Sequence, residues 1–191
     1  MNHNQTPKST NRRARPRPSG LKLLCVSALL AALSMVLGKY LAINVTDSIR
    51  LSFENLPVLM AGIFLGPLAG AAVGTVADLL GCILVGYSIN PIITAGAALI
   101  GLLSGLVARA FTRGGRSLSP LGIYTAVYTA HIVGSMVVKS IGLAVYFSTP
   151  IPVLAIRIPV YLVVGALEGA VILLLARNRL FTGELRKILR Y

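Results

Sequence analysis

The chain has 191 residues, of which 55% are hydrophobic and 12% are charged, and it contains no Trp. This composition excludes an ordinary soluble domain, in which about 25% of residues are charged. The formal charge of +13 would suit a nucleic-acid-binding surface, but the Lys and Arg residues gather in the two tails and in one connecting loop. We therefore expect a membrane protein with lipid around it and no nucleic-acid partner.

The first segment, residues 1–20, is basic, contains three prolines and lacks an apolar run. It cannot bury enough surface to fold, so we expect a disordered cytoplasmic tail. A basic segment before an apolar one is also typical of a secretory signal. The apolar run 21–43 is longer than a signal core of roughly 7–15 residues, however, and is interpreted as a first transmembrane helix that the mature protein keeps.

The rest of the chain is organised in apolar runs, and a helix needs about 20 such residues to cross ~30 Å of hydrocarbon. The second run is too short to be assigned a full crossing by itself, and Gly66-Pro67 separates it from the third. We predict an all-α membrane protein, a bundle of six transmembrane helices within a domain at 21–177, followed by a basic cytoplasmic tail at 178–191. The six runs are 21–43, 53–65, 67–85, 91–111, 120–147 and 152–176.

Basic residues set the expected orientation, because Lys and Arg in short loops are retained on the cytoplasmic side. Both tails and the loop between the fourth and fifth runs are rich in them. With both termini inside, only Lys39, Arg50, Lys139 and Arg157 lie toward the outer side. The sequence thus predicts a multi-pass protein of the cell membrane with both termini in the cytoplasm.

Small residues recur at four-residue spacing on four of the predicted helices, a pattern that lets helix backbones approach closely in lipid. We expect the glycine pairs to pack helices within the bundle, and leave the role of the alanine pair open at this point. The pairs are Ala28 and Ala32, Gly70 and Gly74, Gly101 and Gly105, and Gly165 and Gly169.

The fifth predicted helix carries a polar stripe, and ionisable groups inside a membrane span are functional candidates because they are costly to bury. Residues at steps of three or four share one face of a helix. The stripe consists of Tyr124, Tyr128, His131, Ser135 and Lys139. A lone histidine such as His131 is more often a hydrogen-bonded core residue than a ligand contact, and no neighbouring histidine suggests a metal site.

Lys139 and Arg157 lie at a similar depth near the outer surface, since the fifth and sixth helices run in opposite directions. Together with Arg50 they can converge on a pocket for a carboxylate or phosphate, which arginine grips with two donors and lysine with a point charge. The alternative for Lys139 and Arg157 is that each side chain extends to the outer lipid headgroups. Aromatic side chains that could cover a flat ring in the pocket are Phe53, Tyr146 and Tyr161.

Two carboxylates also fall within the spans. Asp78 lies near the membrane centre, where it needs a cation or hydroxyl partner and either holds the bundle together or touches a ligand. Glu168 lies too deep for an outer site, so we expect a structural role or a contact with a partner. No cofactor site is expected.

Catalytic motifs are missing from the sequence. It has no phosphate-binding loop, no H-E-x-x-H zinc pair and no C-x-x-C, so the chain cannot hydrolyse ATP by the usual route, and energy for transport must come from elsewhere. Ser104 within Gly101-Leu-Leu-Ser-Gly105, with His131, faintly resembles an intramembrane serine protease. A packing serine is the preferred interpretation, and no enzyme activity is expected.

Four short stretches, taken in order, resemble the substrate-binding S components of energy-coupling-factor vitamin importers, most of all the folate family. They are Ile49-Arg-Leu-Ser-Phe-Glu-Asn-Leu-Pro57, Ala61-Gly-Ile-Phe-Leu-Gly-Pro67, Gly70-Ala-Ala-Val-Gly74 and Ala77-Asp-Leu-Leu-Gly81. The resemblance covers roughly residues 21–110. Positions of the family motif are occupied by Arg50, Phe53, Pro57, Gly66, Pro67 and Asp78.

The resemblance implies a six-helix S component whose vitamin site faces outward, capped by the loop between helices 1 and 2 and lined largely by helices 4 to 6. It also implies partners, namely a transmembrane T component and two cytoplasmic ATPase subunits. Ala28 and Ala32 match the A-x-x-x-A pattern used for docking on the T component. The ligand-binding candidates are Arg50, Phe53, Asn90, Thr94, His131, Ser135, Lys139, Tyr146, Arg157 and Tyr161.

The fourth helix departs from the folate pattern at its entry. Folate relatives often carry a Phe-Pro-Gly-Phe-Thr-like segment there, where this chain has Ile89-Asn-Pro-Ile-Ile-Thr94. Pantothenate or another anionic vitamin is therefore the alternative ligand. A structural membrane scaffold subunit is the alternative function, and it would need neither the polar stripe nor a ligand.

Overall fold

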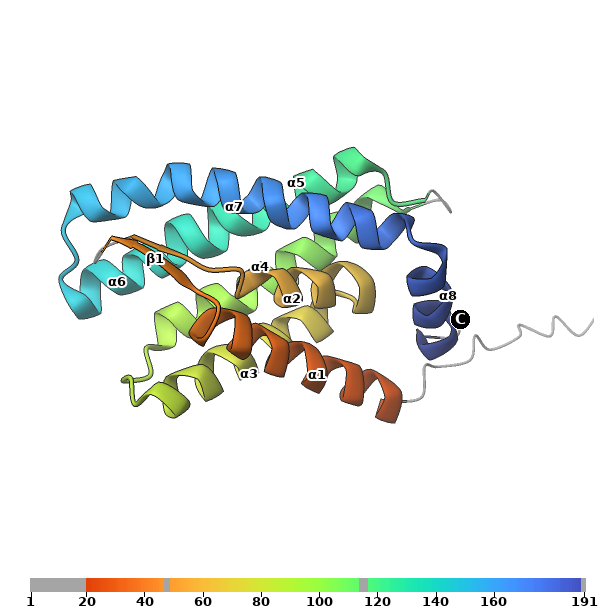
Figure 1. The fold of residues 1–191 in the computed structure, drawn as a ribbon, viewed down its shortest axis with the longest axis horizontal. Helices are drawn as coiled ribbons and strands as arrows, with labels where there is room; N and C mark the ends of the chain where they lie inside the picture. Colours follow the sequence, from red (N-terminus) through yellow and green to blue (C-terminus); the bar gives the residue numbers. More distant parts are fainter. Residues whose placement is uncertain (1–19, 47–48, 114–116, 190–191) are drawn as a thin grey trace, which may run out of the picture.

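The computed structural model describes residues 20–46, 49–113 and 117–189, with side chains described over 20–42, 52–113 and 117–185. Figure 1 shows long helices lying side by side, a small hairpin at one end of the bundle and a short helix across the other end. The elements are α1 (Gly20–Lys39), β1 (Ile43–Thr46), β2 (Ile49–Leu51), α2 (Asn55–Met60), the π-helix η1 (Ala61–Leu65), α3 (Pro67–Val85), α4 (Pro91–Phe111), α5 (Pro120–Ala130), the π-helix η2 (His131–Val138), α6 (Lys139–Phe147), α7 (Ile151–Arg177) and α8 (Arg179–Leu189).

Five helical segments of the described chain are long and apolar enough to cross a membrane. They are Gly20–Lys39, Pro67–Val85, Pro91–Phe111, Pro120–Phe147 and Ile151–Arg177. The third and fourth predicted spans match to the residue, since each begins with a proline, whose missing N–H costs nothing at a helix start. The all-α membrane fold predicted from the sequence is confirmed. The domain limits stay predictions. Residues 1–19, which make up nearly all of the segment expected to be disordered, lie outside the described residues.

The second predicted span is a short helix enclosed by the others. Asn55–Leu65 is one apolar helix, α2 continued by η1, and at about 1.5 Å per residue it covers only ~16 Å, half of the hydrocarbon thickness. It contacts α1, α3 and α4, and its Leu59 and Ala61 are completely buried. In the described part of the chain, the bundle therefore contains five helices of full length and a sixth, short one.

The first long helix ends at Lys39, four residues before the predicted limit, because the following residues form a β-hairpin. Strands β1 and β2 pair antiparallel, with Ile43 opposite Leu51 and Asn44 opposite Arg50. Strand β2 also contacts α7, so the hairpin lies over the end of the bundle where α6 and α7 join (Figure 1). The resemblance implied only a loop between helices 1 and 2 here.

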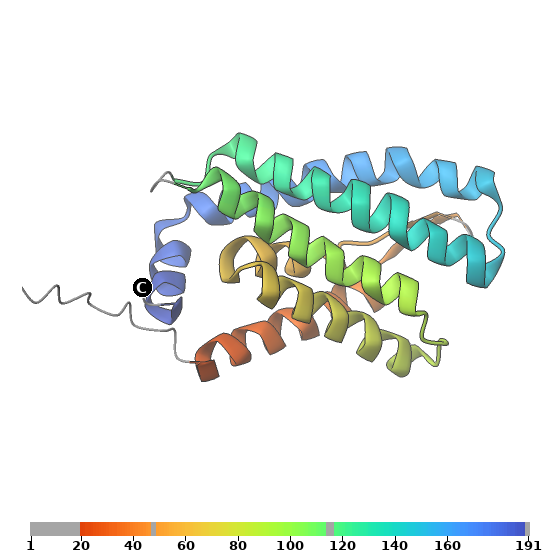
Figure 2. The same cartoon turned by 180° about the vertical axis from the view of Figure 1, so that it is seen from behind.

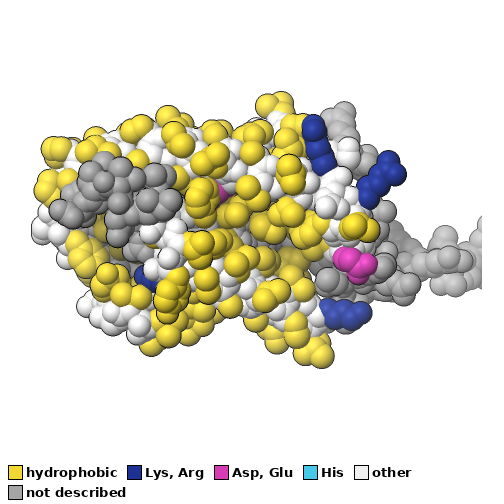
Figure 3. Space-filling view, viewed as in Figure 1, with side chains coloured by type: hydrophobic (Ala, Val, Ile, Leu, Met, Phe, Trp, Pro, Cys, Tyr) yellow, Lys and Arg dark blue, Asp and Glu magenta, His cyan; other side chains and the backbone are white. Residues whose placement is uncertain are grey.

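The C-terminal segment predicted as a tail contains the helix α8. Asn178 begins it, its side-chain Oδ1 accepting a hydrogen bond from the Leu180 amide at 2.9 Å. The Phe181 ring meets the edge of Phe64 at 5.3 Å between centroids, which holds α8 against η1. Figures 1 and 2 show α8 lying across the end of the bundle at which α1 begins. Lys and Arg side chains gather at that end, whereas the sides of the bundle are hydrophobic (Figure 3).

Glycines bring the helices into close contact, as the small-residue pattern predicts. Gly70 of α3 and Gly101 of α4 meet backbone to backbone, and a side chain on either would collide with the carbonyl of the other. On α7, Gly169 leaves room for the ring of Tyr124 from α5. The prediction that the glycine pairs pack helices within the bundle is confirmed.

We expect Gly101→Ala to destabilise the protein by about 1–3 kcal/mol, because the added methyl group forces α3 and α4 apart in a packed interior. The melting temperature of the purified protein in detergent should fall. Gly20→Ala is the matched control, since no atom lies within 4 Å of a Cβ at that position. Equal melting temperatures for the two variants would contradict the close contact.

Candidate ligand-binding site

A cavity of about 500 Å³ lies at the hairpin end of the bundle. Residues from the last turn of α1, from the α3–α4 connection and from the region where α6 passes into α7 line it. Its volume falls within the range of roughly 300–1,000 Å³ that is typical of small-molecule sites. The apolar part of its wall consists of Ile93, Leu143, Phe147, Val153, Leu154 and Val160.

Charged side chains of both signs line this cavity. Three are cationic, Lys39, Lys139 and Arg157, and two are carboxylates, Glu54 and Asp78. With all five ionised, the described lining carries one net positive charge. The cavity therefore favours a molecule that brings a negative group and also offers hydrogen-bond donors to the carboxylates.

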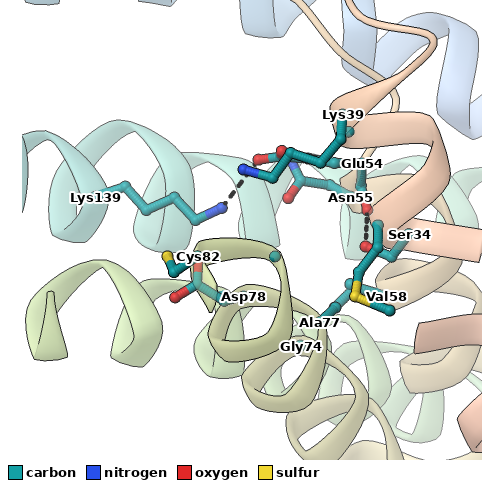
Figure 4. Close-up of a pocket in the computed structure, with 14 residues that line it drawn as sticks. Ser34, Lys39, Glu54, Asn55, Val58, Gly74, Ala77, Asp78, Cys82 and Lys139 are labelled. Atoms are coloured by element: carbon teal, nitrogen blue, oxygen red, sulfur yellow. Dashed lines mark hydrogen bonds and ion pairs between the residues drawn. The ribbon is translucent and has the colours of Figure 1, made fainter. Parts of the chain in front are cut away.

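Lys139 points into the bundle and not toward lipid headgroups. Its side chain is 8% exposed, and its Nζ lies 3.4 Å from Oε1 of Glu54, which precedes α2. A buried charge needs such a partner, because the cost of removing it from water is several kcal/mol. Figure 4 shows Lys139 extending toward Glu54 and Lys39, which approach it from the opposite side, with Asp78 on α3 nearby. The alternative prediction, in which the Lys139 side chain extends to the outer lipid headgroups, does not match this position.

Lys39 helps to close the same end. Its Nζ lies 5.2 Å from the centroid of the Tyr87 ring, a cation–π arrangement between α1 and the α3–α4 connection. The contact joins two segments that border the cavity. A ligand entering there meets a cation and an aromatic face together.

A smaller chamber of about 50 Å³, lined by residues of α1, α2, α3 and α4, shares five lining residues with the cavity. Ser34 lies in its wall and donates a hydrogen bond of 2.6 Å to the backbone carbonyl of Glu54. Asn55, only 3% exposed, also lines it, and its Nδ2 has no hydrogen-bond partner among the described residues. Since buried amide groups are normally paired, this donor is available to a water molecule or to an acceptor on a ligand.

Arg157 enters the cavity from α7. One of its terminal nitrogens, Nη2, donates to the backbone carbonyl of Ser135 at 3.3 Å and to the hydroxyl of Tyr161 at 3.2 Å. Tyr161 also lines the cavity, and its ring centroid lies 5.4 Å from the guanidinium carbon. The two contacts hold the guanidinium inside the bundle. Arg157 therefore does not extend to the lipid headgroups either.

Asn90 and Thr94 shape the wall at the start of α4. Asn90 lines the cavity, but its Oδ1 accepts from the amides of Ile92 and Ile93 and its Nδ2 donates to the Gly142 carbonyl. Thr94 does not line the cavity. It donates a 2.6 Å hydrogen bond to Oδ2 of Asp78 and thereby orients that carboxylate. Asp78 lies in the walls of both the cavity and the chamber.

Four other predicted ligand contacts lie outside the cavity, and their role in ligand binding stays a prediction. His131 and Ser135 are completely buried, and their side chains make hydrogen bonds with each other and, for His131, with Glu168. Phe53 is half-buried without lining the cavity, and Tyr146 is 55% exposed.

The π-helix explains why the polar stripe does not continue. The Lys139 amide bonds to the Gly134 carbonyl five residues earlier, one more than in an α-helix. The extra residue rotates the following turns, so Lys139 faces the cavity while His131 and Ser135 do not. A constant period of 3.6 residues could not predict this.

The outcome for the remaining candidates is mixed. Arg50 belongs to β2, but its side chain lies outside the described residues. Glu54 and Lys39 were not predicted as site residues. Glu54 follows Phe53 in the motif. Because it is an ionisable residue at the edge of a predicted span, the sequence could have identified it as a candidate. Cys82 also lines the cavity as a free thiol.

Ala28 and Ala32 lie on the outer surface of α1, both exposed, whereas Ala31 between them is 3% exposed and faces the bundle. The two alanines thus lie on the outside of the first span. Their role in docking stays a prediction.

The arrangement of Ser104 and His131 does not support a serine protease. The hydroxyl of Ser104 donates to the Gly101 carbonyl at 3.0 Å. Both ring nitrogens of His131 are engaged, one with Ser135 and the other with Glu168. Ser104 and His131 therefore do not form a hydrogen-bonded pair.

Comparison with known proteins agrees with the predicted resemblance. Residues 22–177 match the family model described as ECF transporter, substrate-specific component, where ECF stands for energy-coupling factor. No curated protein sequence matches the chain.

Two solved structures share the fold. The crystal structure of FolT bound with folic acid is 19% identical, with a TM-score of 0.66, over 84% of this chain and 96% of that chain. The structure of the S component of a bacterial ECF transporter is 23% identical, with a TM-score of 0.65, over 91% of this chain and all of that chain. Since the family model spans most of the sequence, this chain belongs to the substrate-specific components of ECF transporters.

Proposed function

We propose that the chain captures a folate-like, anionic, ring-bearing vitamin from outside the cell and presents it to partner subunits for ATP-driven uptake. The observation that carries the proposal is the cavity of about 500 Å³, in which Lys39, Lys139 and Arg157 stand beside Tyr87 and Tyr161. Cations suit the carboxylates of such a vitamin, and the aromatic faces suit its ring. The similarity of the fold to FolT bound with folic acid is consistent with a folate-like ligand.

The charge distribution supports an outward-facing cavity. Exposed basic side chains at the end opposite the cavity, on α1, α4, α7 and α8 and just after α4, include Lys22, Arg109, Arg113, Arg177 and Arg179. By the positive-inside rule we assign this end to the cytoplasm, with both termini inside and the hairpin end outside.

The partners proposed for uptake are a transmembrane T component and two cytoplasmic ATPase subunits. Because the chain has no phosphate-binding loop, it needs them as its source of energy. We assign it no enzyme activity, only binding and release.

Equilibrium binding to the purified chain in detergent tests this function. Folic acid should bind more tightly than pantothenate in a panel of vitamins measured by calorimetry. Tight binding of pantothenate instead would change the ligand but keep the function. Absence of binding across the panel would favour the alternative of a structural membrane scaffold.

Cys82 offers a direct probe of where the ligand lies, because it lines the cavity whereas Cys25 is exposed on α1. In a Cys25→Ser background, folic acid at ten times its Kd should slow maleimide labelling of Cys82 by about tenfold, since roughly nine sites in ten are then occupied. The Cys82→Ser variant, labelled at Cys25, is the control and should show no protection. Equal labelling of Cys82 with and without bound ligand would place the ligand elsewhere.

A further inference from the structure

Glu168 and His131 form a buried pair that ligand contact does not explain. Both side chains are completely buried, and Oε2 of Glu168 lies 2.6 Å from Nε2 of His131. Neither residue lines the cavity or the chamber. Ionisable groups inside a membrane span are costly, so a pair of them in the interior needs a reason.

Contacts lead from this pair to the cavity by two routes. The His131 ring lies 5.2 Å from the Tyr161 ring, tilted by 34°, and Nδ1 of His131 lies 3.2 Å from the hydroxyl of Ser135. Tyr161 and Ser135 are the two residues whose oxygens accept hydrogen bonds from Nη2 of Arg157. Both acceptors that hold the guanidinium are thus held in turn by His131.

The π-helix makes one of these acceptors available. In a regular α-helix the Ser135 carbonyl would receive the amide of Lys139, but that amide bonds to Gly134. Arg157 donates to the Ser135 carbonyl from the neighbouring helix α7. The local backbone geometry of η2 and the placement of Arg157 therefore depend on each other.

We propose that Glu168 is a positioning residue for the ligand anion: through His131 it holds Tyr161 and the Ser135 segment, and these aim the guanidinium of Arg157 into the cavity. This inference rests on the proposed function, since it assigns Arg157 to the anionic group of the ligand. Glu168 acts through one oxygen only, because its Oε1 has no hydrogen-bond partner among the described residues. Glu168→Gln keeps the shape of the side chain and replaces the carboxyl group by an amide at that single contact.

A double-mutant cycle between Glu168→Gln and Arg157→Met tests the proposal, with the Kd for folic acid as the measurement. Alone, Glu168→Gln should weaken binding roughly tenfold, in the range of couplings carried by side-chain networks. In the Arg157→Met background it should weaken binding by less than about twofold, since the group that it positions is gone. Equal losses in both backgrounds, or no loss in the single variant, would overturn the proposal.

Two variants separate positioning from general damage. Ser104→Ala removes a buried hydroxyl whose hydrogen bond stays within α4, and it should leave the Kd unchanged. Ser135→Ala removes the other partner of His131 and should weaken binding in the same direction as Glu168→Gln, again only while Arg157 is present. It keeps the cycle measurable should Glu168→Gln fail to fold.

A measurement without ligand distinguishes failure of this inference from failure of the proposed function. In protein labelled with fluorotyrosine, the ¹⁹F resonance of Tyr161, assigned by Tyr161→Phe, should shift in Glu168→Gln while that of Tyr87 does not. An unmoved Tyr161 resonance would refute positioning whichever vitamin binds. A shift combined with no binding of any vitamin by the unmodified chain would refute the proposed function alone.

Discussion

Lys139→Met is expected to weaken binding of the anionic vitamin about a hundredfold. Two effects add: the ligand loses a charge-assisted hydrogen bond, worth about 1.5–3 kcal/mol, and the Glu54 carboxylate, deprived of its 3.4 Å contact with Lys139, repels the incoming anion. Each 1.4 kcal/mol is tenfold in Kd, so about 3 kcal/mol accounts for the loss. Calorimetry in detergent measures it, with Lys22→Met, an exposed change at the other end of the bundle, as the matched control.

The second of these effects, the repulsion between the Glu54 carboxylate and the ligand, can be measured separately. Adding Glu54→Gln to Lys139→Met removes the repulsion and should restore part of the affinity. No recovery would mean that Glu54 does not face the ligand. An unchanged Kd in Lys139→Met itself would remove the ligand from the cavity and contradict the proposed site.

Ala28→Trp or Ala32→Trp is expected to abolish co-purification with the T component and leave the Kd for the vitamin unchanged. Both alanines are exposed on α1, and a ring there would hold the partner helix away from the close contact that small residues permit. Their side chains do not line the cavity, which α1 borders through Lys39. Loss of binding and of docking together would indicate a misfolded protein.

A matched change on another helix gives this prediction its control. Val171 is 42% exposed on α7, and Val171→Trp should leave co-purification intact. If Ala28→Trp and Ala32→Trp also co-purify with the T component, then α1 is not the docking face. The exposed alanines would then simply contact lipid.

Much of the architecture could be predicted because lipid limits the choices. A backbone inside hydrocarbon must satisfy its own hydrogen bonds, so long apolar runs become helices, and proline and glycine mark their limits. The span Pro91–Phe111 matches its prediction to the residue for this reason. The helix α8 was missed, since its apolar residues are too few for a span. Phe181 and Leu185 gain their partners only when Phe64 and the bundle core are in place.

The sequence by itself determined that the chain is a membrane helical bundle, that Lys139 and Arg157 lie at one depth, and that glycines join the helices. Only the tertiary structure decided which polar groups meet. Lys139 and Glu54 are 85 residues apart, and His131 and Glu168 are 37 apart. Such pairs depend on the rotation of each helix about its axis, and in η2 one extra residue per turn changes that rotation. The hydropathy pattern indicates how deep a residue lies in the membrane, but it does not depend on the rotation of a helix about its axis. It therefore predicted the depth of the charged residues but not which of them are in contact.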